Sequence, residues 1–421
     1  MKYEFLKLMK NKIVLLCILF SFGISIYTGF KTAGNYDENK DIDYKTYTGE
    51  VTRQRSDDIE NEYKVVMSNY AISKNKVSAY EKDEVSKYAT ITEEDVESMS
   101  NNEKQKYSDE MYVWSIIYGN LENRIKSKEF RENVKKNSML LAESGDIYTK
   151  SVNELAYKKY SKKVKYEVFG STLETNLMNG WTYINYSDYI NIVCVIIVVC
   201  LIFLMEHSRN TYSMIFSSYN GRLKTYINKS IVITIISILL AVLTTIIGII
   251  PYMGKRGFMQ VMNADIQNFS EFIYSPYSLK LYQVILIMIA LRIIAYVSIA
   301  AVLTFITTFF KKSIVPFSVG TLLFCGGFAM YSKFVDKMNL MEGSGRGISD
   351  LTGKYKLYRM YTPFGFLRNG IKYFSTYEPN NIINKPVMTV TIAVCIHIMY
   401  IVVFFVAGYL VYRFRFRKKG V

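Results

Sequence analysis

The chain has 421 residues, half of them apolar, and a formal net charge of +16. A basic nucleic-acid-binding protein would concentrate that charge in a soluble domain. Residues 31–188 instead hold 24 Lys and Arg against 28 Asp and Glu, so the positive excess lies beside the apolar runs, where it contacts anionic lipid heads, and we expect no nucleic-acid partner.

Six apolar runs are long enough to cross a membrane. A span needs roughly 20 apolar residues, because the hydrocarbon core is about 30 Å thick and a helix rises 1.5 Å per residue. These runs lack the polar face of a soluble core helix and are longer than buried strands. They are 13–30, 189–205, 230–252, 281–310, 313–331 and 387–412. The sequence thus predicts an all-α polytopic membrane protein with six transmembrane helices and a mainly helical extracellular domain.

Residues 1–30 form the N-terminal segment and the first span. A cleaved signal peptide is the alternative interpretation, but ISIYTGFKTAGNY offers no clear small-residue cleavage site, and the apolar stretch is long for such a peptide. We therefore expect a span that stays in the protein.

Residues 31–188 are long enough for a domain between the first two spans. Thr92 and Asp95 resemble a capping box at a helix start, and the segment contains no Pro, which favours long helices. Residues at helical spacing are Ile59, Tyr63, Val66 and Tyr70, then Met111, Trp114, Tyr118, Leu121 and Ile125, then Val152, Leu155 and Tyr160. We expect a mainly helical domain with at most a small sheet, and we interpret these stripes as core.

Residues 189–421 are predicted to form a five-span membrane domain, and its first two spans are joined by a polar, basic stretch. Ser208 is suited to cap a helix over 207–220. Apolar side chains at i, i+3, i+4 and i+7 give that helix one apolar face; they are Tyr212, Ile215, Phe216 and Tyr219. Asn220 and Gly221 tolerate positive φ and are predicted to end it. Such a helix lies at the membrane interface or docks in a groove of a soluble partner.

Two polar residues are predicted to lie inside spans. Arg292 falls near the middle of 281–310, where a charge is costly unless it faces protein or water. It either lines a substrate pathway or belongs to a structural pair. His397, in the last span, either belongs to the same pathway or makes a helix–helix hydrogen bond.

The sequence gives no sign of catalysis by this chain. The nearest approaches to a phosphate-binding loop, at 248–256 and 347–355, have five residues where the motif has four, and both lack its hydroxyl residue. The cysteines all fall inside apolar runs, away from any metal-ligand spacing; they are Cys17, Cys194, Cys200, Cys325 and Cys395. We expect no enzyme activity, no catalytic residue, no metal site and no cofactor in this chain.

Lys and Arg indicate the orientation. With both termini in the cytoplasm, about one residue in three is basic on the inner side and about one in seven on the outer side. The tail YRFRFRKKG contributes most to this bias. The predicted extracellular loop 332–386 fits least well, because KLYRMYTPFGFLRNGIKYF is basic for an outer segment.

The stretch after the second span resembles the cytoplasmic loop of ABC-2 type transporter permeases. That family shows an acid at the end of the second span, then Gly-Thr, a helical patch, and an Arg and a Lys before the third span. Residues at the matching positions are Glu206, Thr211, Arg222 and Lys229. Asn210 replaces the usual Gly, and Glu206 lacks the second acid and base that often follow it. The six-span layout and the ending TPFGFLRNG to RFRFRKK also agree, whereas 31–188 looks like the insertion that some members carry.

The resemblance implies a subunit of an ATP-driven exporter in the bacterial cell membrane, multi-pass, with both termini cytoplasmic. Two permease subunits, identical or not, would pair with two separate ATPase subunits, which bind ATP and Mg²⁺. The helix 207–220 would be the coupling helix that docks on the ATPase. The implied coupling residues are Glu206, Arg209, Thr211, Tyr212, Ile215, Phe216, Tyr219, Arg222 and Lys229. A peptide, antibiotic, lipid or similar molecule would be the substrate.

Two other functions fit the layout. A mechanotransmission protein pairs with an ATPase and moves outer partners, although that kind has four spans. A sensor or scaffold would not need the coupling-helix pattern. A secondary transporter would show internal repeats, and the sequence has none.

Overall fold

The computed structural model describes residues 10–34, 49–58, 60–61, 99–144, 146–168, 188–204, 221–255, 257–343, 349–368, 370–383 and 385–415. In these residues, five helical segments are long and apolar enough to cross a membrane, and the helix Asp188–Leu204 is a shorter apolar one. The protein is therefore mainly helical, and its long apolar helices indicate that it is embedded in a membrane.

The long helices follow the predicted spans, with different ends. They are α2 (Lys12–Gly34), α10 (Gly221–Met253), α12 (Leu281–Thr307), α18 (Thr389–Arg415), and a run of α13 (Ile314–Gly320), the π-helical η6 (Thr321–Gly326) and α14 (Gly327–Gly343). Pro316 lies in the first turn of α13, where its missing N–H leaves no helix hydrogen bond unmade.

The third span starts earlier than the apolar run does. Gly221 is the first residue of α10, so Arg222, Lys224 and Lys229 belong to the helix itself, although the sequence pattern placed them on the approach to the span. Hydropathy misses this turn because its residues are polar. Lys229 is nevertheless fully buried, and Tyr226 nearly so.

The segment after the fifth span is more ordered than the predicted loop 332–386. Helix α14 extends to Gly343 and is followed by α15 (Ser349–Tyr361), α16 (Phe364–Arg368) and α17 (Lys372–Ser375). An antiparallel hairpin of β3 (Pro379–Ile382) and β4 (Lys385–Met388) then leads into α18. The connection 332–386 therefore contains helices and a hairpin, and α16 buries Phe364, Phe366 and Leu367.

The residues between the first two spans form a helical hairpin with a small sheet, as the periodicity predicts for the described part. Helix α6 (Asn101–Ser144) turns back into α7 (Ile147–Tyr160), and β1 (Gly49–Glu50) pairs antiparallel with β2 (Glu167–Val168). Members of the predicted stripes are buried: Leu121, Ile125 and Tyr160. The predicted helix around 59–70 and the capping box at Thr92 and Asp95 lie outside the described residues, apart from 60 and 61.

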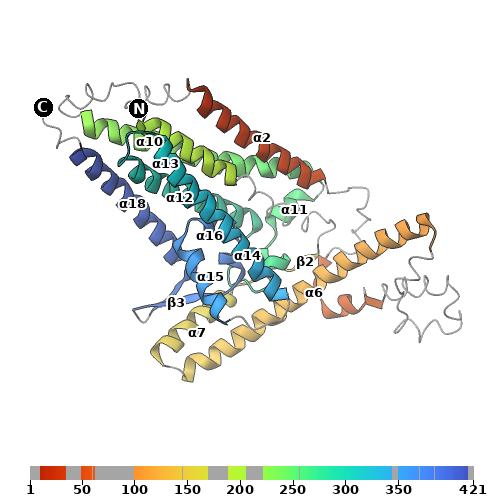
Figure 1. Cartoon of the computed structure of the whole chain (residues 1–421). Helices are drawn as coiled ribbons and strands as arrows, with labels where there is room; N and C mark the ends of the chain where they lie inside the picture. The colour runs from red at the N-terminus through yellow and green to blue at the C-terminus, as the bar shows by residue number, and fades with distance from the viewer. Residues whose placement is uncertain are drawn as a thin grey trace, which may run out of the picture.

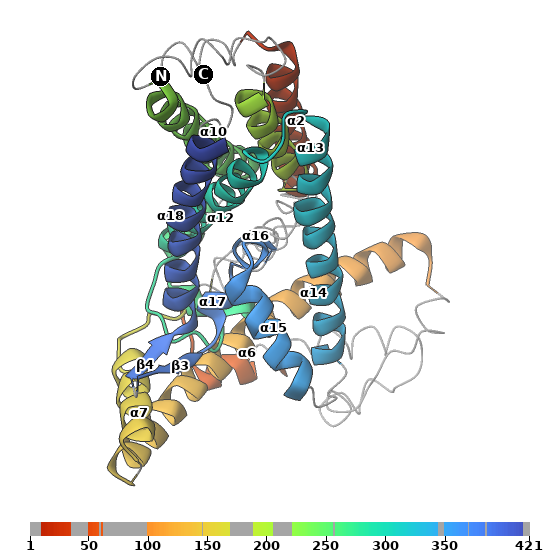
Figure 2. The same cartoon turned by 60° about the vertical axis from the view of Figure 1, so that its left-hand side comes forward.

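The helices form a bundle with the extra-membrane elements gathered at one end. Figures 1 and 2 show α6, α7, α15 and β3 at that end, and the start of α10 and the last turns of α18 at the other. Short elements join α10 to α12 at the α6 end: α11 (Phe258–Asn263), η4 (Ile266–Asn268) and η5 (Ser270–Phe272). Helices α2 and α10 approach closely at Gly29, where an added Cβ would lie 3.3 Å from the carbonyl oxygen of Gly248. Small residues allow such close helix contact in membranes.

Candidate functional site

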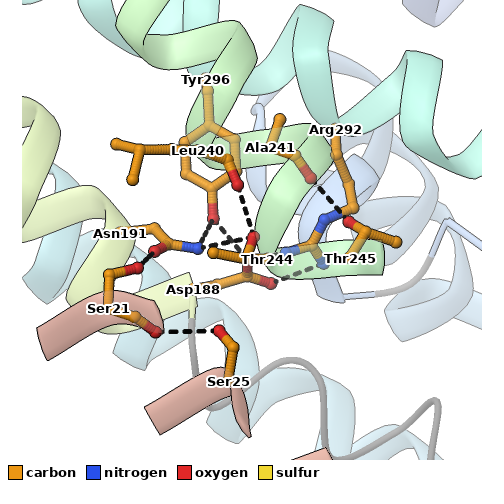
Figure 3. Close-up of polar contacts among 10 residues, drawn as sticks. All are labelled: Ser21, Ser25, Asp188, Asn191, Leu240, Ala241, Thr244, Thr245, Arg292 and Tyr296. Atoms are coloured by element: carbon orange, nitrogen blue, oxygen red, sulfur yellow. Dashed lines mark hydrogen bonds and ion pairs between the residues drawn. The ribbon is translucent and has the colours of Figure 1, made fainter. Parts of the chain in front are cut away.

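A closed polar cluster lies about midway along α2 and α12, surrounded by apolar helices (Figure 3). Its centre is an ion pair between Asp188, the first residue of the short apolar helix, and Arg292 of α12. The two nitrogens Nη1 and Nη2 of Arg292 each donate to one carboxylate oxygen, with Nη1 3.2 Å from Oδ2. Asp188 is fully buried and Arg292 is 2% exposed. This bidentate geometry is the strongest that an arginine and a carboxylate form.

Tyr296 and Asn191 extend the cluster around this pair. The hydroxyl of Tyr296, one helical turn after Arg292, donates to Asp188 Oδ1. Asn191 lies one turn after Asp188, and its Nδ2 donates to Tyr296 Oη over 3.1 Å. Both residues are fully buried. The spacing of three and four residues therefore places two polar groups from each helix on the shared face.

Two further helices join the cluster through Asn191. Its Nδ2 also donates to Thr244 Oγ1 of α10 over 3.3 Å, and Ser21 Oγ of α2 donates to its Oδ1. The Thr244 hydroxyl in turn donates to the carbonyl of Leu240, 2.6 Å away. The cluster thus ties α2, the helix Asp188–Leu204, α10 and α12 together. A buried polar network of this kind fixes the relative register of the helices that share it.

Of the two interpretations of Arg292 that the sequence left open, its contacts match the structural pair. Its charge is neutralised by Asp188, and only its Nε lacks a hydrogen bond to the described residues. A substrate contact would have to break this pair, so a pathway role for Arg292 stays a prediction. Sequence reasoning missed Asp188 because an acid at the edge of an apolar run is ordinarily assigned to water.

His397 lies on the other side of α12, in α18. Its ring is fully buried and packs 4.7 Å from the ring of Phe366 in α16, centroid to centroid. Its Nδ1 is 2.8 Å from the carbonyl oxygen of Ala393. Ser298 Oγ of α12 donates to the backbone carbonyl oxygen of His397 over 3.5 Å. The contact with Ala393 lies within α18, the ring packing and the Ser298 bond join α18 to α16 and α12, and a pathway role stays a prediction.

A second cluster, made of aromatic rings, lies at the opposite end of the bundle from α6 (Figure 1). Phe203, near the end of the short helix, packs on Tyr226 of α10 and Tyr412 of α18, with ring centroids 5.6 and 6.3 Å apart. Lys229 Nζ lies 5.5 Å from the centre of the Phe203 ring. Tyr226 Oη donates to the carbonyl oxygen of Phe405 in α18 over 2.7 Å. The described residues that flank 205–220 on both sides are therefore held by aromatic contacts.

Most of the predicted coupling helix lies outside the described residues. This applies to Glu206, Arg209, Thr211, Tyr212, Ile215, Phe216 and Tyr219. Arg222 lies in the first turn of α10, and Lys229 is the one member whose side chain the structure describes. Lys229 lies beside the aromatic cluster, with its Nζ against the ring of Phe203.

The hairpin of α6 and α7 is held against the loop between η5 and α12. Ser127 Oγ of α6 donates to the carbonyl oxygen of Ile273 over 2.8 Å, and Tyr160 Oη of α7 donates to that of Tyr274 over 2.9 Å. The amide of Glu167 donates to Asn268 Oδ1 over 2.9 Å. Direct hydrogen bonds therefore join this hairpin to the segment before α12.

A second buried arginine stabilises the segment before α18. Arg359 of α15 is 2% exposed and pairs with Glu378, and its guanidinium lies 4.8 Å from the centre of the Tyr373 ring. Burial lowers the pKa of Arg359, but Glu378 and the neighbouring tyrosines together more than compensate, so its pKa lies above the ordinary value. The basic character of this segment thus has a local partner.

Within the described residues, no group of three or more His, Cys, Asp or Glu side chains is placed to hold a metal ion. Comparison of the chain with protein-family models and with curated proteins finds no match.

Proposed function

We propose that this chain is the transmembrane permease subunit of an ABC-2 type exporter. It would couple ATP hydrolysis by a separate ATPase subunit to export of a peptide, antibiotic, lipid or similar substrate, together with a second permease subunit. Under this proposal the protein crosses a bacterial cell membrane six times, with Asp188–Leu204 as the second crossing, both termini in the cytoplasm and residues 31–188 outside.

The observation that carries the proposal is the aromatic cluster at the base of residues 205–220. A loop that receives force from a partner needs firm attachment to the spans that it moves. Phe203, Tyr226 and Tyr412 attach both flanks of this stretch to α18. A push on the stretch would therefore move three helices together.

The polar cluster around Asp188 supports the same proposal from the other end of the short helix. The helix Asp188–Leu204 is tied to α12 by the ion pair at its start and to α10 and α18 by aromatic packing at its end. A helix held at both ends transmits displacement along its length instead of tilting alone.

Charge supports the orientation. Basic residues at the end of the bundle that carries the start of α10 are Lys10, Lys12, Lys224, Lys229, Lys311, Lys312 and Arg413. The positive-inside rule assigns such an end to the cytoplasm.

Introducing negative charge on either face of 207–220 tests the ATPase interaction. Ile215→Asp with Phe216→Asp places two charges on the predicted apolar face and should abolish co-purification with the separate ATPase subunit that the proposal requires. Ser213→Asp with Ser217→Asp adds the same charge to the opposite face and should leave co-purification intact. Equal co-purification of both variants with the ATPase would reject the docking role.

The mechanotransmission alternative is favoured by one observation, the direct hydrogen bonds from α6 and α7 to the loop before α12. Such bonds would carry span movements to an outer partner without transport. Vesicles containing this chain, its ATPase and candidate substrates separate the two functions. ATP-dependent accumulation of a substrate supports the exporter; ATP-dependent movement of α6 without accumulation supports mechanotransmission.

A further inference from the structure

A pocket of about 660 Å³ lies between α6 and the chain that follows α7. Small-ligand sites have volumes of this order, roughly 300–1,000 Å³. Five of its lining residues are basic: Lys128, Arg131, Lys135, Lys162 and Lys165. Tyr160 and Tyr166 contribute aromatic surface, and Val51 comes from beside β1. The pocket therefore combines positive charge with rings and a little apolar surface.

The basic residues come together because of helix geometry. Lys128, Arg131, Glu132 and Lys135 of α6 are spaced i, i+3, i+4 and i+7, so they lie on one face of the helix. The opposite wall is the extended stretch 161–167, which is pinned by hydrogen bonds to the loop before α12. The amide of Lys165 donates to Asp265 Oδ2 over 2.7 Å. Both walls are thus fixed before any ligand arrives.

The charge of the pocket differs from that of its domain. Residues 31–188 as a whole have more acids than bases, yet the pocket has five bases and two acids, Glu132 and Glu167. One of those acids, Glu167, already forms an ion pair with Lys165. The pocket keeps an excess of three positive charges.

Arg131 lies at the buried side of this pocket and lacks an acidic partner. It is 7% exposed, and its guanidinium donates to the carbonyl oxygens of Lys159, Lys162 and Ser275 and to the hydroxyl of Ser278, at 3.0–3.2 Å. All four acceptors are neutral. In the described part of the chain no carboxylate forms an ion pair with Arg131, whereas the buried Arg292 and Arg359 each have one.

The environment of Arg131 disfavours its charged form. Burial lowers the pKa of Arg131, and the acidic groups around it, Tyr166, Tyr160 and Asp265, oppose that shift only in part. A buried charge without a counter-charge is costly. An anionic ligand would supply the missing counter-charge, and its oxygens would accept from the exposed lysines at the pocket mouth.

The pocket also lies close to the start of a span. Arg131 contacts Ser278, which precedes the first residue of α12, Leu281, by three residues. Phosphate groups of membrane lipids lie beside the ends of membrane-spanning helices, and α12 is long and apolar enough to be one. A single carboxylate would leave much of the excess charge unmatched, whereas a diphosphate carries two or more negative charges.

We propose that this pocket binds a diphosphate-bearing anion, with Arg131 and the lysines of α6 and 161–167 as its counter-charges. The source is either a soluble diphosphate or the head of a diphosphate-bearing lipid. The lining residues of this pocket include none of the predicted coupling residues, so the site does not depend on the exporter assignment.

Calorimetric titration of the full-length protein in phosphatidylcholine nanodiscs tests the proposal, with inorganic diphosphate as the probe. Lys135→Gln and Lys162→Gln remove lining charges and should each raise Kd about tenfold, the effect expected from losing a charge-assisted hydrogen bond. Lys136→Gln and Lys163→Gln remove the neighbouring exposed charges, which do not line the pocket, and should leave Kd within about twofold. The matched pairs have the same net charge.

Two further arms define the ligand. Farnesyl diphosphate incorporated in the nanodisc should compete with inorganic diphosphate if the source is a lipid, and should not compete if the source is soluble; both results keep the site. Absence of saturable binding, equal weakening by all four substitutions, or tighter binding of triglutamate than of diphosphate would each overturn the proposal.

Discussion

Asp188 and Arg292, 104 residues apart in the sequence, neutralise each other at the point where four helices meet. Removing two charges from water costs free energy that their attraction repays only with good geometry and further hydrogen bonds. Here Tyr296 supplies a further hydrogen bond to Asp188. The pair therefore specifies how the helix Asp188–Leu204 is placed against α12.

Asp188→Asn should destabilise the protein by about 3–5 kcal/mol, because it leaves the Arg292 charge buried without a partner. The loss is measured by heating the protein in detergent and determining the fraction that remains folded and monodisperse. Asp188→Leu with Arg292→Met removes both charges at similar volume and should restore most of the stability. Equal destabilisation by the single and the double variant would show that charge pairing is not the cause.

The same double variant separates the two roles of Arg292. If Arg292 acts only through Asp188, vesicles containing the neutral pair and the ATPase should export as the unchanged protein does. If Arg292 contacts an anionic substrate, export should fail although the protein is folded. Measuring both export and thermal unfolding on the same preparation distinguishes the two outcomes.

Gly365→Ala should destabilise the protein by about 1–3 kcal/mol through overpacking. An added Cβ would lie 2.2 Å from the carbonyl oxygen of Arg359, a backbone atom that cannot move alone. Gly326→Ala is the control, since nothing lies within 4 Å of its Cβ position. Thermal unfolding of the two variants should differ clearly, and equal values would contradict the close packing of α16 on α15.

The start of α7 should loosen in acid. Asp146 Oδ1 accepts from the amide of Thr149 over 2.7 Å, and bonding to Thr149 holds the pKa of Asp146 below its ordinary value of 3.8. The contribution of a group with a lowered pKa is complete above the ordinary value and is lost as the pH falls through the lowered one. The protection of the Thr149 amide against hydrogen exchange should therefore rise with pH in the unchanged protein. It should rise less in Asp146→Asn, where a neutral cap replaces the carboxylate. Identical pH profiles would exclude this cap as the cause.

Single cysteines test which end of the bundle is outside. Lys150→Cys on α7 should react with a membrane-impermeant maleimide in intact cells, and Lys224→Cys at the start of α10 should react only after lysis. Both positions are exposed. The five natural cysteines lie in apolar helices, which makes them a low background. The reverse pattern would overturn the orientation and the coupling role with it.

The sequence predicts the long helices well because each needs a run of apolar side chains, and hydropathy measures that property directly. Helical spacing likewise predicts α6 and α7, since Leu121, Ile125 and Tyr160 recur at helical intervals. These features depend on neighbours in the chain.

Features that depend on distant residues escape prediction. Asp188 looks like a water-exposed acid until Arg292, from another helix, is placed beside it. The basic segment after α14 looks unsuited to its position until Arg359 meets Glu378. Lys229 looks like a loop residue, although the packing of Phe203 and Tyr226 encloses it. In each case a polar side chain is buried by a contact that local patterns do not contain.

Helix α6 has 44 residues, so it is a rod about 66 Å long. It contacts the loop before α12 through Ser127 and Arg131, well away from its first residue, Asn101. That arrangement is a lever with an off-centre pivot. A rotation of only about 10° at Arg131 would sweep Asn101 through roughly 8 Å, a displacement as large as a side chain at the far tip.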